Sequence, residues 1–167
     1  VDTDVLVIGA GTSGYFAAAS AAESGARTLL IEKAANGNSV RSSALGAVNS
    51  KLQQAEGEKA AINPMEITND MDRYADGQIH SALIRKWALN SGEALDWYID
   101  LMAKNGIEVQ LEWNMPKDTF YKEWPTGHGT NGEYPAREGE VAKIIDAYIT
   151  SFPNCEIRFE CPMRNLI

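Results

Sequence analysis

Apolar residues follow two patterns in this 167-residue chain, short runs near its ends and helical spacing in between. The runs at 4–8 and 28–31 are almost entirely apolar, and a third short run lies at 156–160. Runs of this length without helical spacing are typical of buried strands in a parallel sheet. We therefore predict three parallel strands over these residues.

Helical spacing predicts most of the middle of the chain. Pro64 favours a helix start, so one helix is expected over 64–74 and another over 82–90. A third helix is expected to begin after Ser91, as its N-cap, and to end at Asn105. Its predicted buried face holds Ala94, Trp97, Tyr98, Leu101 and Met102. A last helix is predicted over 138–151, and the Gly- and Pro-rich residues 112–137 are predicted as a loop.

The turn after the first strand carries a glycine motif, Gly9-Ala-Gly-Thr-Ser-Gly14. Gly9 permits a tight turn, Gly11 lets the backbone approach a pyrophosphate, and Gly14 allows the next helix to pack closely on the strand. Backbone amides near Thr12 and Ser13 would face phosphates at the positive end of that helix. The motif predicts a dinucleotide-binding α/β domain.

Glu32 ends the second predicted strand, 23 residues after Gly9. A carboxylate at this place can accept hydrogen bonds from a ribose hydroxyl of either NAD or FAD. The residues that follow, 36–50, are rich in Ser, Asn and small side chains. Such a segment can line a flavin and its ribityl chain, or it can be a flexible loop. It favours FAD over NAD, because NAD-binding folds usually return to the sheet through a helix at this point.

Composition excludes some classes of partner and site. The net charge of −8 argues against nucleic acid and against anionic membranes. No apolar run approaches the ~20 residues that span a bilayer. Cys155 and Cys161 would lie roughly 20 Å apart in a strand, which is too far for a disulfide. Their spacing fits no metal or redox motif, and no metal site is predicted.

Several segments together resemble the flavoprotein subunits of fumarate reductase and succinate dehydrogenase. The similarity rests on the glycine turn, Ile31-Glu-Lys33, the segment Arg41-Ser-Ser-Ala-Leu-Gly-Ala-Val-Asn49, the helical residues 83–97, and Trp124-Pro-Thr-Gly127. Bacterial fumarate- and urocanate-type flavin reductases and adenylylsulfate reductase belong to the same superfamily. The resemblance covers nearly the whole chain and is most specific in the first 50 residues.

The resemblance implies FAD as the cofactor and assigns residues to its parts. The pyrophosphate would lie on Gly9, Gly11, Thr12, Ser13 and Gly14. The adenosine ribose would bind Glu32, with Lys33, Ala34, Pro162 and Met163 around the adenine. Ser42 and Ser43 would contact the ribityl-phosphate region, and Leu45, Gly46 and Ala47 would approach flavin N5.

The fold that the resemblance implies is a Rossmann-like FAD-binding domain of the glutathione-reductase type, with a helical insertion. We expect residues 1–50 to form its first part, 51–135 to form the insertion and Gly/Pro-rich loop, and 136–167 to return to the sheet. Three strands are few for a doubly wound sheet. We therefore expect the chain to be part of a larger flavoprotein.

The function implied is reduction of an activated C=C bond of a fumarate- or urocanate-like acid. Adenylylsulfate reductase-like sulfur chemistry, an NAD-dependent dehydrogenase and a non-catalytic FAD-binding domain are the alternatives. No catalytic residue is assigned. Family members can link flavin to a histidine in the serine-rich loop, but this chain has only His80 and His128. We therefore predict non-covalent FAD.

His128 has two interpretations, a contact with substrate or flavin, and a surface residue of a glycine loop. The partners expected are a small-molecule substrate and, by resemblance, an electron-transfer domain or subunit. We predict no transmembrane segment and a cytoplasmic location, and an export signal upstream of Val1 is the alternative.

Overall fold

The computed structural model describes residues 2–37, 44–112, 122–133 and 136–165. The chain divides into two compact units. Unit 1 comprises Val1–Ser43 and Gly132–Ile167, and unit 2 comprises Ala44–Asn131.

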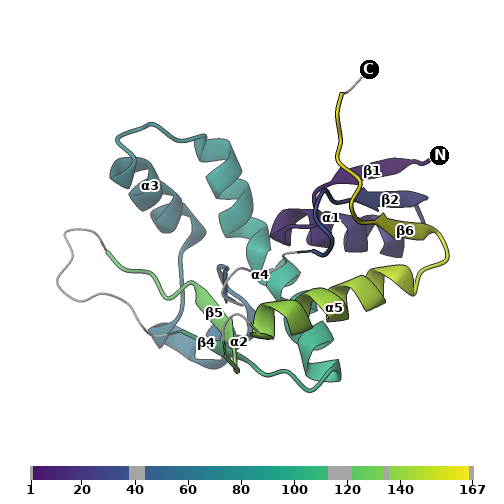
Figure 1. The fold of residues 1–167 in the computed structure, drawn as a ribbon. Helices are drawn as coiled ribbons and strands as arrows, with labels where there is room; N and C mark the ends of the chain where they lie inside the picture. Colours follow the sequence, from purple (N-terminus) through teal and green to yellow (C-terminus); the bar gives the residue numbers. More distant parts are fainter. Residues whose placement is uncertain (1, 38–43, 113–121, 134–135, 166–167) are drawn as a thin grey trace. The chain divides into compact units, whose positions relative to one another are not determined.

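Unit 1 contains the predicted parallel sheet. Its strands are β1 (Val5–Ile8), β2 (Thr28–Ile31) and β6 (Cys155–Arg158), in the order β1-β2-β6 (Figure 1). Thr28 pairs with Val5 on one side and with Cys155 on the other, and all the pairing is parallel. All four residues of the central strand are buried. The three predicted strands are confirmed, although β6 begins one residue earlier and ends two residues earlier than predicted.

Two helices pack within unit 1, α1 (Thr12–Glu23) and α5 (Ala136–Thr150). Helix α1 buries Ala18, Ala19 and Ala22, whose small side chains permit close contact with its neighbours. Helix α5 buries larger aliphatic residues, among them Ile145 and Ile149. Because most of the buried side chains of α1 are alanines, this helix lies close to the sheet and to the larger isoleucines of α5.

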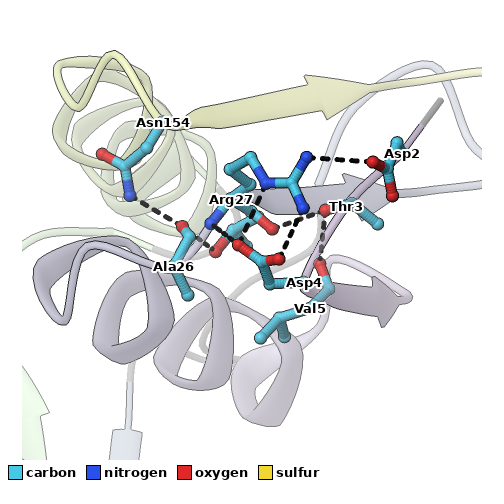
Figure 2. A network of polar contacts seen from close by, with 8 residues as sticks. Asp2, Thr3, Asp4, Val5, Ala26, Arg27 and Asn154 are labelled. Atoms are coloured by element: carbon cyan, nitrogen blue, oxygen red, sulfur yellow. Dashed lines mark hydrogen bonds and ion pairs between the residues drawn. The ribbon is translucent and has the colours of Figure 1, made fainter.

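Arg27 ties together the amino ends of the strands (Figure 2). Its guanidinium donates to Asp4 at 2.7 and 3.1 Å and to Asp2 at 3.1 Å. On the other side of β2, the Asn154 amide donates to the carbonyls of Ala26 and Ala22 at 2.7 and 3.0 Å. Because the Arg27–Asp pairs are exposed, water screens them and they add little to stability. Their main effect is to fix the register at the end of the sheet opposite the glycine turn.

Unit 2 combines a small antiparallel sheet with helices. The sheet has the order β3-β5-β4, from β3 (Ala44–Gly46), β5 (Gly127–Thr130) and β4 (Val109–Leu111). The helices are α2 (Lys51–Ala55), a 3₁₀ turn (Gly57–Lys59), α3 (Pro64–Tyr74) and α4 (Ser81–Lys104). Helix α3 has the predicted bounds, with Asn63 as its N-cap and Pro64 in its first turn.

Helix α4 corrects the prediction of two helices that meet at Ser91. It runs unbroken over 24 residues, and Ser91 lies inside it. The Ser91 hydroxyl accepts a hydrogen bond from the backbone N–H of Val48 at 3.0 Å. The next residue, Gly92, has no side chain because a Cβ there would lie 2.6 Å from the Val48 carbonyl. Ser91 and Gly92 therefore allow α4 to pack against the backbone at Val48, and they do not cap a helix.

Two further sequence predictions are wrong in detail. Ala94 is exposed, while Leu95 and Ile99 join Tyr98 in the buried face of α4. The predicted loop 112–137 contains β5 and the first two residues of α5 among its described residues. Strand β5 was not predicted because its glycines lack the β-branched and aromatic side chains by which strands are recognised.

His128 lies on β5 and is 1% exposed, so it is not a surface residue. Its Nδ1 lies 2.8 Å from the Thr126 carbonyl, which can only accept, so this nitrogen carries the proton. Nε2 then accepts from the Ser50 hydroxyl at 2.7 Å. Gln53 completes the network, since its amide donates to the Pro125 carbonyl at 2.6 Å. The network joins α2 and its N-cap to β5.

The buried imidazole predicts how the stability of unit 2 depends on pH. Burial lowers the pKa of His128 below the ordinary value of 6.5. The unfolded chain therefore binds this proton more readily than the folded chain. The stability that the neutral ring provides is complete above about pH 6.5 and is lost as pH falls toward the lowered pKa.

We expect His128→Asn to lower the free energy of unfolding by about 1–3 kcal/mol at neutral pH, because Ser50 loses its buried acceptor. The variant should also lose part of the wild-type decline in stability between about pH 7 and about pH 5. Urea denaturation at both pH values measures this. His80→Asn is the matched control, since His80 is exposed, and it should keep the wild-type decline. An unchanged pH dependence in His128→Asn would contradict the assignment.

Candidate functional site

The carboxyl ends of the three parallel strands meet at one edge of unit 1. The N–H of Gly9 donates to the Ile31 carbonyl at 2.8 Å, and the N–H of Glu32 donates to the Arg158 carbonyl at 2.9 Å. Beyond β6, the N–H of Cys161 returns to the Glu32 carbonyl at 2.8 Å. These bonds place the glycine turn, Glu32 and the segment after β6 side by side. In open α/β sheets, ligands bind at this edge.

A pocket of about 200 Å³ lies at this edge. Of the predicted site residues, Gly9, Glu32, Lys33, Pro162 and Met163 line it. The other three lining residues, which had no predicted role at the site, are Ile8, Ile31 and Cys161. Two of them are the last residues of β1 and β2, so their positions relative to the motif could have identified them. Cys161 could be placed only once β6 was paired with β2.

The glycine turn has the geometry that its sequence predicts. Gly9 has a φ of +98°, a conformation that favours glycine. A Cβ at Gly14 would lie 1.8 Å from the Gly9 carbonyl oxygen, so only glycine lets α1 start this close to β1. A Cβ at Gly11 would meet no described protein atom within 4 Å. Gly14 is therefore needed for packing, whereas Gly11 leaves open space beside the turn.

The start of α1 suits an anion. Gly11 is the N-cap and has no side chain to offer the first amides of the helix. The first turn, which includes Thr12 and Ser13, carries no acidic residue. No acidic residue of this turn opposes an anion at the positive end of the helix dipole, which is the end at which phosphates bind.

Glu32 is held at the end of β2 by backbone donors. One carboxylate oxygen accepts from the N–H of Ala34 at 2.8 Å, and the other accepts from the N–H of Ala10 at 2.7 Å. These two bonds lower the pKa of Glu32 below its usual value, so the group is ionised at neutral pH. Each oxygen keeps a further lone pair for a ligand hydroxyl.

The remaining predicted residues lie in three places. Lys33 and Ala34 are exposed beside Glu32. Ser42 and Ser43 lie outside the described residues. Three predicted flavin-side residues belong to unit 2, where Leu45 and Gly46 are in β3 and Ala47 directly follows. The Gly46 carbonyl accepts from Trp87 Nε1 at 3.0 Å, and the Ala47 N–H donates to the Thr126 carbonyl at 2.9 Å.

The described residues contain no cluster of His, Cys, Asp or Glu that could hold a metal ion. Cys155 and Cys161 are free thiols, in agreement with the prediction that they form no disulfide. None of the helices in the described part of the chain has the length and apolar character to cross a membrane.

Comparison with known proteins decides the family. Residues 4–167 match the family described as FAD binding domain. The chain belongs to this family. Its cofactor is FAD, which sets aside the alternative of an NAD-dependent dehydrogenase. The site fits FAD, because the open space at Gly11, the uncapped start of α1 and the ionised Glu32 match a pyrophosphate and a ribose.

Two curated members of known activity are similar in sequence. The chain is 30% identical to the digoxin reductase of Eggerthella lenta over 173 aligned positions, across 99% of this chain and 30% of that protein. It is also 30% identical to the vinyl phenol reductase of Lactiplantibacillus plantarum over 109 positions, across 64% of this chain and 21% of that protein. The chain therefore spans less than a third of the length of these relatives.

The fold is similar to that of a flavocytochrome c3 fumarate reductase. The TM-score is 0.65 at 21% sequence identity, over 95% of this chain and 26% of that chain. The family match and this fold confirm the predicted α/β FAD-binding domain and its resemblance to fumarate reductase-type flavoproteins.

We expect a substitution by alanine to have different effects at Gly11 and at Gly14. Gly11→Ala should fold normally, because its φ of −86° suits alanine and its Cβ meets no described protein atom. It should weaken FAD binding about tenfold, because the methyl group would occupy the space in which we expect the pyrophosphate. Gly14→Ala should instead lower the free energy of unfolding by about 1–3 kcal/mol, since α1 must move off the Gly9 carbonyl.

Isothermal titration with FAD and urea denaturation of both variants measure the two effects. Gly139→Ala is the control for an alanine substitution on a helix, since a Cβ there also meets no described atom. Wild-type affinity in Gly11→Ala would show that the pyrophosphate does not lie at this turn.

Proposed function

We propose that this chain is the FAD-binding portion of a reductase that acts on an activated C=C bond of a fumarate- or urocanate-like acid. The observation that carries the proposal is the 30% identity to digoxin reductase across 99% of the chain. Vinyl phenol reductase, the second relative, is also named as a reductase. The bound FAD would supply the two-electron chemistry by exchanging a hydride at N5.

The residues of unit 1 would hold the adenosine diphosphate part of the cofactor. Backbone at Gly9, Gly11 and Gly14, with the first amides of α1, would bind the pyrophosphate. The ionised Glu32 would accept from the ribose, using the lone pairs that Ala10 and Ala34 leave free. The pocket beside Pro162 and Met163 would take the adenine, with Lys33 and Ala34 at its exposed side.

The residues proposed for the flavin half are Ser42, Ser43, Leu45, Gly46 and Ala47. In β3, Gly46 is exposed and offers bare backbone, against which a flat ring can lie. His128 is proposed to have no contact with substrate or flavin, because it is buried between Ser50 and the Thr126 carbonyl. We assign no substrate-binding or proton-donating group to this chain.

The cofactor is proposed to be non-covalent, because neither histidine of the chain lies in the serine-rich loop. We expect the purified chain to show the absorbance bands of oxidised flavin, either as isolated or after addition of FAD. Acid precipitation should then release the yellow colour into the supernatant as FAD. A flavin that stays with the precipitated polypeptide would contradict non-covalent binding.

The substrate class can be tested in the complete protein. After anaerobic reduction of the flavin with dithionite, we expect fumarate or urocanate to restore the absorbance of oxidised flavin. A vinyl phenol tests the chemistry of the second relative, and succinate is the saturated control that cannot accept a hydride. Reoxidation by the vinyl phenol alone would overturn the acid as substrate while keeping C=C reduction. No reoxidation by any unsaturated compound would overturn the proposed reaction.

A further inference from the structure

Tyr15 is the most deeply buried polar aromatic residue in the described part of unit 1. It lies in the first turn of α1, directly after Gly14, and its side chain is 0% exposed. A buried hydroxyl requires a hydrogen-bond partner. Tyr15 donates to Asp146 Oδ1 of α5 at 2.6 Å. Burial raises the pKa values of both groups, so the phenol stays protonated and is the donor.

The phenol also lies against the loop that follows Glu32. A Cβ at Gly37 would be 1.7 Å from the Tyr15 hydroxyl oxygen and 2.5 Å from the ring carbon that carries it. Gly37 does not have a positive φ, so its backbone conformation does not require glycine. Glycine is needed at this position because of Tyr15. Gly37, the last residue in the described part of this loop, therefore rests directly on the phenol.

The loop from Glu32 to Gly37 is thereby held at both ends. At its start, the Glu32 carboxylate accepts from the Ala34 N–H. At its end, Gly37 contacts a phenol whose position is set by Asp146. Residues 33–36 between these points are exposed and lie next to the pocket, which Lys33 lines.

We propose that Tyr15 and Asp146 are positioning residues for the cofactor, which act by fixing the loop from Glu32 to Gly37 beside the FAD site. This inference rests on the proposed binding of the adenosine half in unit 1. Neither side chain lines the pocket, and both act through Gly37. A loop fixed before binding loses less conformational entropy when the ligand arrives, which increases affinity.

The chain offers a matched control for a purely structural role. Tyr148 of α5 donates to Glu23 of α1 at 2.6 Å, the same distance and the same pair of helices. That bond is exposed, and no described glycine lies against its phenol. Tyr15→Phe and Tyr148→Phe each remove one tyrosine–carboxylate bond between α1 and α5. Only the first removes the atom closest to Gly37.

Two readouts test the proposal in the whole chain. We expect Tyr15→Phe to weaken FAD binding about tenfold and Tyr148→Phe to change it less than twofold, by titration under conditions where both variants are folded. We also expect faster tryptic cleavage after Lys33 in Tyr15→Phe without FAD, and wild-type cleavage in Tyr148→Phe. Equal effects of the two variants on either readout would overturn the proposal.

Gly37→Ala provides a second route, should Tyr15→Phe fail to fold. The added methyl group should push the loop off the phenol, accelerate cleavage after Lys33 and weaken FAD binding, with Gly139→Ala as control. Wild-type behaviour of Gly37→Ala would also overturn the proposal. Absence of FAD binding in the wild-type chain would instead refute the proposed site. The cleavage rates would then still decide whether Tyr15 fixes the loop.

Discussion

The arrangement of unit 1 depends on the contact between Gly14 and the carbonyl of Gly9. The 1.8 Å that would separate a Gly14 Cβ from that oxygen leaves no room for any side chain. This contact sets where α1 begins and directs its first turn toward the edge where β1 and β2 end. The following residue, Tyr15, is then carried inward to Asp146 and Gly37. The absence of a side chain at Gly14 thus sets the position of both the start of α1 and the buried phenol of Tyr15.

The charges of unit 1 are satisfied differently at the two ends of its sheet. At the amino ends, Asp2 and Asp4 share the guanidinium of Arg27, so a side chain of opposite charge compensates part of their negative charge (Figure 2). At the carboxyl ends, Glu32 is held by the N–H groups of Ala10 and Ala34. Backbone donors fix the carboxylate without cancelling its charge, so it can still bind hydroxyl groups. The end at which backbone donors hold the carboxylate is the one suited to a ligand.

The sequence predicted unit 1 better than unit 2, for a physical reason. The strands of unit 1 are short apolar runs next to a glycine motif whose spacing is fixed by sterics, so local sequence is sufficient. Strand β5 of unit 2 reads Gly-His-Gly-Thr, and no local preference favours a strand there. It forms because two neighbouring strands supply the hydrogen bonds. Ser91 likewise resembled an N-cap, and only its contact with Val48 shows why a helix interior carries it.

The same distinction explains which site residues could be identified. Gly9, Gly14 and Glu32 act through short-range geometry, and the sequence alone assigned them a role. The role of Tyr15 depends on Asp146, 131 residues away, and His128 depends on Ser50, 78 residues away. A tyrosine in a helix and a histidine between glycines carry no sign of such partners in the sequence. Buried polar pairs of this kind restrict the alternatives open to a chain, because each must be satisfied by one specific neighbour. They therefore pair specific segments that are distant in the sequence. The pattern of apolar residues does not show which segments pair.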